Sequence, residues 1–194
     1  GAMLSKMPGD EWQRFANLRL LYSYMYTYPG GKLLFMGNEL GETGEWRHHG
    51  QLSWGLQEQE RSRGLQLLVA DLNHLYRDEP SLHRRGFEAG GFEWIDCHDS
   101  TQSVLSYLRR DVDDVRVVVG NFTPVVRRGY RIGVPVGGFY REVFNSDSRF
   151  YGGGDMGNEQ AIPSEALPFM GEPHSLSLTL PPLAALVLRR RPDG

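Results

Sequence analysis

Glutamates, histidines and tryptophans gather in the stretch "KLLFMGNELGETGEWRHHGQLSW", which occupies residues 32–54. The stretch contains three glutamates, Glu39, Glu42 and Glu45. They could act as general acids or bind a metal ion. The rings of Trp46 and Trp54 could stack on a sugar, because an aromatic face packs well against the apolar face of a pyranose. Residue types and spacing leave two interpretations equally open: the stretch lines a site, or it only connects two buried elements.

Other patterns that look chemical indicate no site. His48 and His49 are adjacent, so on regular structure they would point in different directions and would not share a metal ion. The neighbours in "HDS", residues 98–100, would not converge as a catalytic triad does, and we interpret them as a hairpin turn. "YGGGDMGNEQ", residues 151–160, lacks the following helix of a phosphate cradle and is expected to be a flexible loop. We predict no metal and no cofactor.

Composition excludes several classes of function. The 194 residues suit one large domain, or one domain and part of another. A net charge of −3 and the absence of a lysine-rich stripe argue against nucleic acid as a partner. No apolar run approaches the ~18 residues of a membrane span, and no signal peptide is visible. The single cysteine, Cys97, fits a cytoplasmic protein, and we expect it to be a half-buried strand residue. Residues 1–3 are interpreted as a cloning scar.

Helical spacing dominates the first part of the chain. Asp10 and Gln13 form the pattern of a capping box, and the helix that follows is apolar almost all round until "PGG" ends it. Residues 33–36 (LLFM) then predict a short buried strand of the parallel-sheet type. A second helix has a clean apolar stripe that starts at Leu65, and Pro80 is expected to end it. Because one helix–strand–helix unit cannot bury both faces of its strand, this part of the chain is predicted to be incomplete by itself.

From about residue 87 the apolar residues recur at every second position. Strands are predicted at 92–95, 104–109, 115–119, 130–134, 139–144, 176–180 and 183–188, with polar turns between them. Several short alternating strands separated by such turns indicate an antiparallel β-sandwich.

Long segments of the chain resemble one known family. "KMPGDEWQRFANLRLLYSYMYTYPGGKLLFMGNELG", "EWRHHGQLSW", "LVADLNHLYRDEPSLHRRGFEAGGFEWIDCHDSTQSVLSYLRR" and "RIGVPVGGFYREVFNSDSRFYGGGDMGN" are similar, in order, to the C-terminal part of bacterial α-1,4-glucan (glycogen) branching enzymes of the α-amylase superfamily. The resemblance implies the end of a (β/α)8 barrel over residues 4–79 and an all-β sandwich domain over residues 80–194. It also implies retaining glucan-chain transfer by carboxylates that precede this segment, so that the chain holds no catalytic residue and is inactive alone.

The resemblance further assigns the opening stretch to the rim of a glucan site. Glu39 matches the glutamate of the family's Met-Gly-x-Glu signature, and Trp46 and Trp54 match its loop tryptophans. Glu45 and His48 complete the predicted rim. The stretch departs from the usual pattern at three positions, where arginine, histidine and serine stand for asparagine, aspartate and aspartate: Arg47, His49 and Ser53.

Two other interpretations remain open, namely a carbohydrate-binding or interaction module without catalysis, and part of another α-amylase-superfamily hydrolase. The expected partner is an α-glucan such as glycogen or amylose. An isolated barrel remnant would also expose apolar surface. We therefore expect it to fold back on the sandwich, to self-associate with a second copy, or to be partly disordered.

Overall fold

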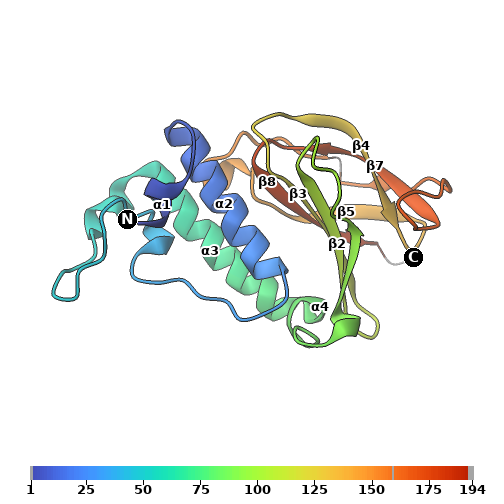
Figure 1. Ribbon diagram of the computed structural model, residues 1–194, viewed down its shortest axis with the longest axis horizontal. Coiled ribbons are helices and arrows are strands. Elements are labelled where there is room, and N and C mark those ends of the chain that lie inside the picture. The colour runs from blue at the N-terminus through green and yellow to red at the C-terminus, as the bar shows by residue number, and fades with distance from the viewer. Residues whose placement is uncertain (1, 159, 192–194) are drawn as a thin grey trace.

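The computed structural model describes residues 2–158 and 160–191. Its helices lie on one side of a large sheet, and a small sheet covers the other side, which gives three layers (Figure 1). The helices are α1 (Met3–Lys6), α2 (Glu11–Thr27), α3 (Glu60–Asp78) and α4 (Pro80–His83), with short 3-10 turns η1 (Asn38–Leu40), η2 (Trp54–Glu58), η3 (Ala89–Gly91) and η4 (Arg149–Tyr151). The strands are β1 (Phe92–Asp96), β2 (Val104–Arg110), β3 (Val115–Asn121), β4 (Arg127–Val134), β5 (Phe139–Asn145), β6 (Ile162–Pro163), β7 (His174–Leu180) and β8 (Ala184–Arg190).

The two long helices form where their sequence signals place them. The predicted capping box at α2 is confirmed, since the Asp10 carboxylate accepts from the Gln13 backbone and the Gln13 side chain accepts from Asp10. The apolar stripe of α3 is buried at Leu65, Leu68 and Leu72. As expected, α3 ends just before Pro80, at Asp78. The proline then begins α4, where its missing N–H is no loss.

Antiparallel pairing joins the strands into two sheets. The large sheet has six strands in the order β1-β2-β3-β8-β5-β6, and β4 pairs with β7 in the small sheet. The predicted antiparallel sandwich is therefore confirmed, and each predicted strand forms with small differences at its ends. The chain crosses between the sheets several times, so that β8, the last strand, lies between β3 and β5.

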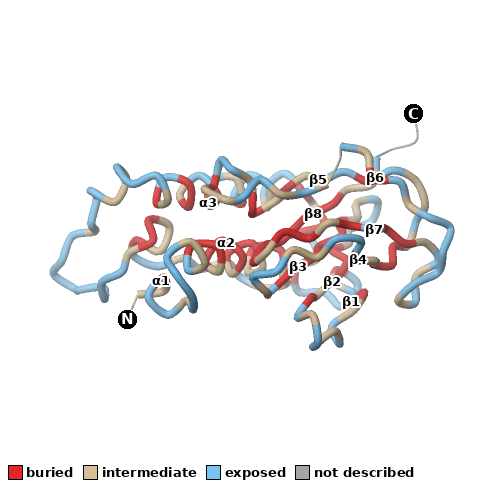
Figure 2. Tube along the Cα trace, turned by 90° about the horizontal axis from the view of Figure 1, so that it is seen from above, coloured by how far each residue is buried: buried red, intermediate tan, exposed pale blue. Residues whose placement is uncertain are grey.

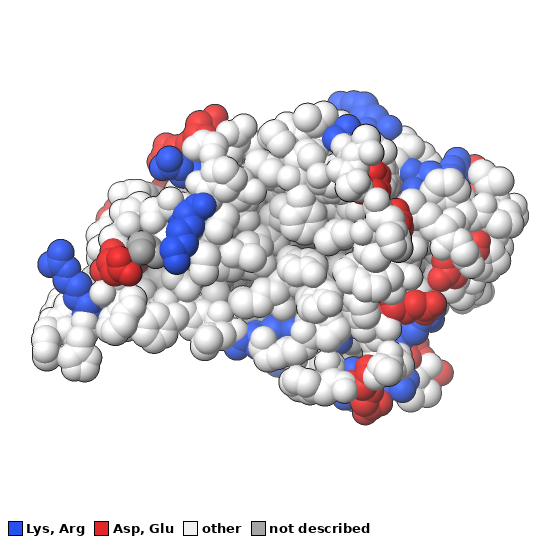
Figure 3. Space-filling view, in the orientation of Figure 1, with Lys and Arg blue, Asp and Glu red and all other residues white. Residues whose placement is uncertain are grey.

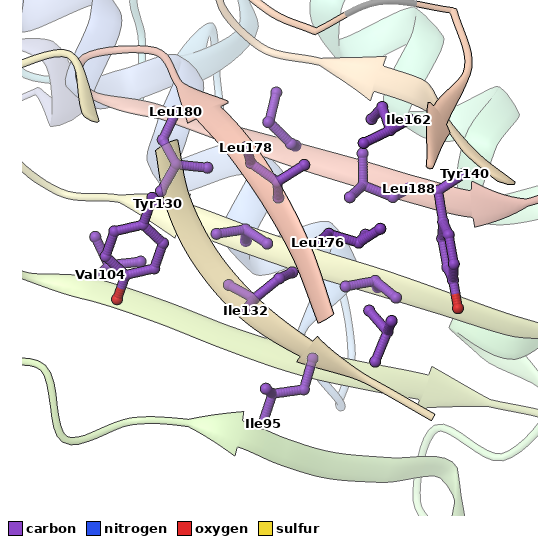
Figure 4. Packing of buried hydrophobic residues seen from close by; sticks show 14 of the residues in the cluster. Ile95, Val104, Tyr130, Ile132, Tyr140, Ile162, Leu176, Leu178, Leu180 and Leu188 are labelled. Atoms are coloured by element: carbon purple, nitrogen blue, oxygen red, sulfur yellow. The ribbon is translucent and has the colours of Figure 1, made fainter. Parts of the chain in front are cut away.

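Side chains on the two faces of the large sheet enter two separate cores. Alternating residues on the inner face meet those of β4 and β7, as the sticks in Figure 4 show for Ile95, Leu188 and Ile132. On the outer face, Tyr107, Val118, Phe144 and Val187 pack against α2 and α3. The buried residues in Figure 2 follow these two interfaces, whereas the loop before α3 is mostly exposed. The helical part thus lies against the sandwich, the first of the three expected outcomes.

The strand predicted at residues 33–36 does not form. These residues have no strand assignment, and the side chains of Leu33 and Phe35 are 76% and 49% exposed. A strand requires a neighbour for its backbone N–H and C=O groups, and no other strand of the described residues pairs with this segment. Helix–loop–helix therefore replaces the expected helix–strand–helix.

Candidate functional site

The loop between α2 and α3 contains all five predicted rim residues, and its base is anchored to the helices. In η1, Leu40 is fully buried and the Tyr22 hydroxyl donates to the Asn38 carbonyl over 2.8 Å. Burial first, and then the charge of Glu39, raise the pKa of the Tyr22 hydroxyl. Glu39 is therefore half-buried beside α2, at the base of the loop rather than at its tip.

Glu42 closes the loop on itself. Its carboxylate accepts a hydrogen bond from the Ser53 backbone N–H at 2.6 Å and another from the Ser53 hydroxyl at 3.1 Å. Gly37, with a φ of 83°, leaves room for this carboxylate, because a Cβ there would lie 2.7 Å from Glu42 Cγ. A hydroxyl at position 53 suits this contact, whereas the aspartate of the family pattern would bring a second negative charge. We infer a structural role for Glu42.

Beyond that closure, the loop bears an open groove of about 440 Å³. Glu45 and Trp46 both line it, together with Met36 and Leu52. The Trp46 ring is 54% exposed and stands edge-on against Phe35, with ring centroids 5.6 Å apart. A half-exposed indole can stack on a sugar ring, and a carboxylate beside it can accept hydrogen bonds from the sugar hydroxyls.

The remaining rim residues do not join this groove. His48 contacts His49, with ring centroids 4.5 Å apart, and both residues are exposed. Trp54 begins η2 and is 55% exposed. The structure thus brings two of the five predicted residues to one surface. In residues 2–158 and 160–191, no three His, Cys, Asp or Glu side chains are arranged to hold a metal ion.

A second aromatic surface, which the sequence interpretation missed, lies where α2 ends beside β1. Trp94 is 38% exposed, and its ring centroid lies 4.9 Å from that of Phe92, 5.6 Å from Tyr107 and 6.1 Å from Tyr28. Phe92 and Trp94 are two apart on one strand, a spacing that places both on the helix-facing side and could have revealed the pair. In the view of Figure 3, which includes α2, β2 and β3, the middle of the molecule is largely uncharged and most charged side chains lie at its rim.

Two groups considered from the sequence are now placed. His98 and Ser100 lie in the connection between β1 and β2, as expected for a hairpin turn. Cys97 is exposed just beyond β1, not half-buried within a strand, which corrects that expectation. Within the described residues, no helix is both long and apolar enough to cross a membrane.

Comparison with known proteins agrees with this architecture. The 1,4-alpha-glucan branching enzyme GlgB of Cellvibrio japonicus is 57% identical over 189 residues, which are 97% of this chain and 26% of that enzyme. The enzyme of the same name from Methylococcus capsulatus is 58% identical over 188 residues, which are 97% of this chain and 25% of that enzyme. The chain therefore spans about a quarter of the length of these curated relatives.

Solved structures share the fold at much lower identity. The protein Ttha1563 from Thermus thermophilus superposes with a TM-score of 0.65 at 18% identity, covering 98% of this chain and 33% of that one. Residues 94–191 match the profile of the family described as alpha amylase, C-terminal all-beta domain. Because this match covers half of the sequence and coincides with the observed sandwich, the chain belongs to the family of alpha-amylase C-terminal all-beta domains.

Proposed function

We propose that this chain is the C-terminal part of a 1,4-α-glucan branching enzyme, which cuts an α-1,4 glucan and rejoins the fragment through an α-1,6 bond. The observation that carries the proposal is the continuity of the similarity, which runs at 57% identity through 97% of the chain, helices and sandwich alike. Residues 4–79 would then complete a (β/α)8 barrel, and residues 80–194 would form the following domain. Residues 1–3 lie outside both, and the cytoplasm is the proposed compartment.

The chemistry of such transfer requires two carboxyl groups on opposite sides of the scissile bond. One attacks the anomeric carbon and the other protonates the leaving oxygen, after which the 6-hydroxyl of another glucan displaces the enzyme. In this proposal those groups belong to the preceding barrel segment. Glu42, which holds Ser53, and Glu39, which lies beside Tyr22, have structural contacts instead. The chain alone is accordingly proposed to be inactive.

The contribution of this chain would be to bind and orient the glucan. The groove that contains Glu45 and Trp46 would face the barrel mouth. Glu39 would support the base of the loop, and His48 and Trp54 would lie on the rim outside the groove. Trp94, backed by Phe92, offers a second stacking surface on the sandwich side. An α-glucan is the proposed partner in both places.

A chimera tests the proposal. The last quarter of the Cellvibrio japonicus enzyme is replaced by this chain, and amylose is followed by iodine staining and by the appearance of α-1,6 linkages. We expect the chimera to lower the iodine colour and form branches, and the chain alone to do neither. Branching by the chain alone would contradict the assignment of the acids to the preceding segment. An inactive but folded chimera would contradict the proposed parent enzyme.

The two other interpretations give different products. A hydrolase would release shorter linear glucans without α-1,6 bonds. A binding module would migrate more slowly in a gel that contains glycogen. Removal of its tryptophans would leave the branching activity of the chimera unchanged. For the proposed enzyme we expect Trp46→Ala to lower branching several-fold, and Trp94→Ala to weaken glycogen retardation of the chain. Trp12→Ala, which alters a helix residue outside both surfaces, is the control and should change neither once its folding is verified.

A further inference from the structure

A groove of about 620 Å³ lies beside the start of β4. In the described part of the chain this strand pairs with β7 alone, and no residue of β7 lines the groove. The groove therefore follows the edge that β4 leaves unpaired. The connection between β1 and β2 contributes Asp96, Asp99 and Gln102 to its lining, and the turn before β7 contributes Phe169.

A bulge in β4 turns two polar side chains of the lining to the same face. Arg127 lies opposite Leu180 and Tyr130 lies opposite Leu178, so three steps along β4 match two along β7. In a regular strand, residues three apart point to opposite faces. The extra residue, at a bulge where Gly129 has a φ of 65°, instead turns both side chains toward the inner face. The two leucines occupy that face (Figure 4).

Hydrogen bonds and charges connect these side chains to the β1–β2 connection. The Tyr130 hydroxyl donates to Asp99 over 2.7 Å, and Asp99 also accepts from the backbone and side-chain N–H groups of Gln102. Burial, and then the hydrogen bond and charge of Asp99, raise the pKa of the Tyr130 hydroxyl. The charge of Asp96 raises this pKa further, and that of Arg127 lowers it. All three charged groups act on one hydroxyl, so they surround one part of the groove.

Arg127 and Asp96 retain hydrogen-bonding capacity. The Arg127 Nη2 atom reaches the Gln102 carbonyl and the Thr123 hydroxyl only at 3.5 Å, and its Nε atom is buried without a partner. The Asp96 Oδ1 atom accepts from the His98 backbone at 3.0 Å, whereas Oδ2 has no hydrogen bond within the described part of the chain. Because a guanidinium only donates and a carboxylate only accepts, the groove offers both kinds of partner to a ligand.

The charges of the lining balance each other. Two carboxylates stand against three guanidinium groups, and one of these, on Arg131, forms an ion pair with Glu165. An anion or a cation would therefore meet no excess of opposite charge, whereas an uncharged ligand with several hydroxyl groups can use donors and acceptors alike. Phe169 adds a ring that is 38% exposed, and such a ring packs well against the apolar face of a pyranose. Together these features favour a sugar.

We propose that this groove binds a short segment of an α-glucan. Phe169 stacks on one glucose ring, Arg127 donates to hydroxyl oxygens, and the Asp96 carboxylate accepts from another hydroxyl. The choice of glucose rests on the proposed function. The site is additional to the two aromatic surfaces described above, since neither Trp46 nor Trp94 lies in its lining.

Nuclear magnetic resonance tests the site directly. Maltotriose is titrated into the isotope-labelled 194-residue chain, and the amide signals of Gln102 and Gly129 are followed. We expect both signals to shift saturably, with a dissociation constant on the order of millimolar. Phe169→Ala should weaken this binding about threefold or more, because stacking is lost. Arg127→Gln should weaken it at least about tenfold, because charge-assisted hydrogen bonds are lost.

Three further variants serve as controls. Phe150→Ala and Arg141→Gln change an exposed aromatic residue and an exposed arginine outside the groove, and both should bind as the unaltered chain does. Trp94→Ala should leave the two amide shifts unchanged. Because Phe169 is partly exposed in a turn, its replacement by alanine should leave the thermal unfolding midpoint unchanged in the absence of sugar.

Three results would overturn the proposal: the two amides do not shift, Phe150→Ala weakens binding as much as Phe169→Ala, or free glycine binds as tightly as maltotriose. Free glycine is the informative competitor, since its carboxylate and ammonium groups could pair with Arg127 and Asp96. A chimera that branches, without sugar binding in this groove, would remove only the site. Sugar binding here, with a folded but inactive chimera, would remove only the proposed parent enzyme.

Discussion

Two cations meet at the end of α2, and burial affects them differently. Arg109 keeps its charge, although burial lowers its pKa, because three backbone carbonyls surround its guanidinium. Lys32 has fewer partners: its amine donates to the Tyr28 carbonyl and lies 5.1 Å from the centre of the Tyr76 ring. Burial first, and then the nearby charge of Arg109, lower the pKa of Lys32 from 10.5 to about 8.

This shift predicts how stability depends on pH. Above about pH 8 the folded protein loses the Lys32 proton while the unfolded chain retains it up to about pH 10.5. The unfolded state then binds more protons, so the free energy of unfolding rises with pH across that window. We expect the unaltered chain to gain stability relative to Lys32→Met between about pH 7 and about pH 9.5, as measured by urea unfolding. Lys6→Met changes an exposed lysine and should show no such gain; a constant difference for Lys32→Met would contradict the shift.

At the scale of elements, the contact between α3 and η4 joins the helices to the sandwich. The Tyr151 hydroxyl donates to the Asp71 carboxylate over 2.7 Å, and Gly64 faces the backbone of Tyr151. A Cβ at position 64 would lie 2.7 Å from the carbonyl carbon and oxygen of Tyr151. These backbone atoms cannot move aside as a flexible side chain would, so glycine is required for close approach.

The substitution Gly64→Ala therefore sets two effects against each other. Within an exposed helix this change would stabilise by roughly 0.5–1 kcal/mol. Here the clash should dominate and lower the free energy of unfolding by about 1–3 kcal/mol, the usual cost of overpacking. Urea unfolding measures the result, with Ala70→Gly, an exposed position of the same helix, as the propensity control. A gain in stability from Gly64→Ala would show that α3 does not dock as described.

How much of this structure the sequence predicts depends on the range of the interactions involved. The capping box at Asp10 and the alternation of the sandwich strands are local signals, and both predictions are confirmed. The strand expected at residues 33–36 is wrong because a strand also needs a partner, which is a long-range condition. Under the proposed function, the barrel segment that precedes this chain would bury the apolar run. The roles of Glu39, Glu45, Trp46, His48 and Trp54 stay predictions.

The pairing register of the strands decides which residues of different strands lie side by side, and the sequence alone could not show this. Arg116 and Arg189 are far apart along the chain, and only the insertion of β8 between β3 and β5 aligns them with Arg141. The same holds for Trp94, whose aromatic neighbours come partly from the end of α2 and from β2. Alternation predicts which face a residue occupies in its own strand, but not which residues lie beside it.

At the scale of the whole molecule, the sheet end buries most of its apolar side chains, whereas the end that carries the loop before α3 exposes several. Side chains on both faces of the large sheet enter buried cores, whereas the segment before η1 exposes Leu33 and Phe35, with Trp46 beside Phe35. Under the proposed function this strip is the surface that the preceding barrel segment covers. In the chain alone it should bind an apolar dye and favour self-association as concentration rises.

Two double substitutions test whether this strip contacts the preceding barrel segment. Leu33→Ser together with Phe35→Ser should reduce dye fluorescence and association of the chain while leaving its free energy of unfolding almost unchanged, because both side chains are largely exposed there. In the chimera the same pair should be buried, and we expect it to lower both thermal stability and branching activity. Val112→Ser with Val125→Ser, two exposed positions elsewhere, is the control and should have little effect in either protein. If the chimera tolerated the first pair as well as the second, the strip would not be a contact with the preceding segment.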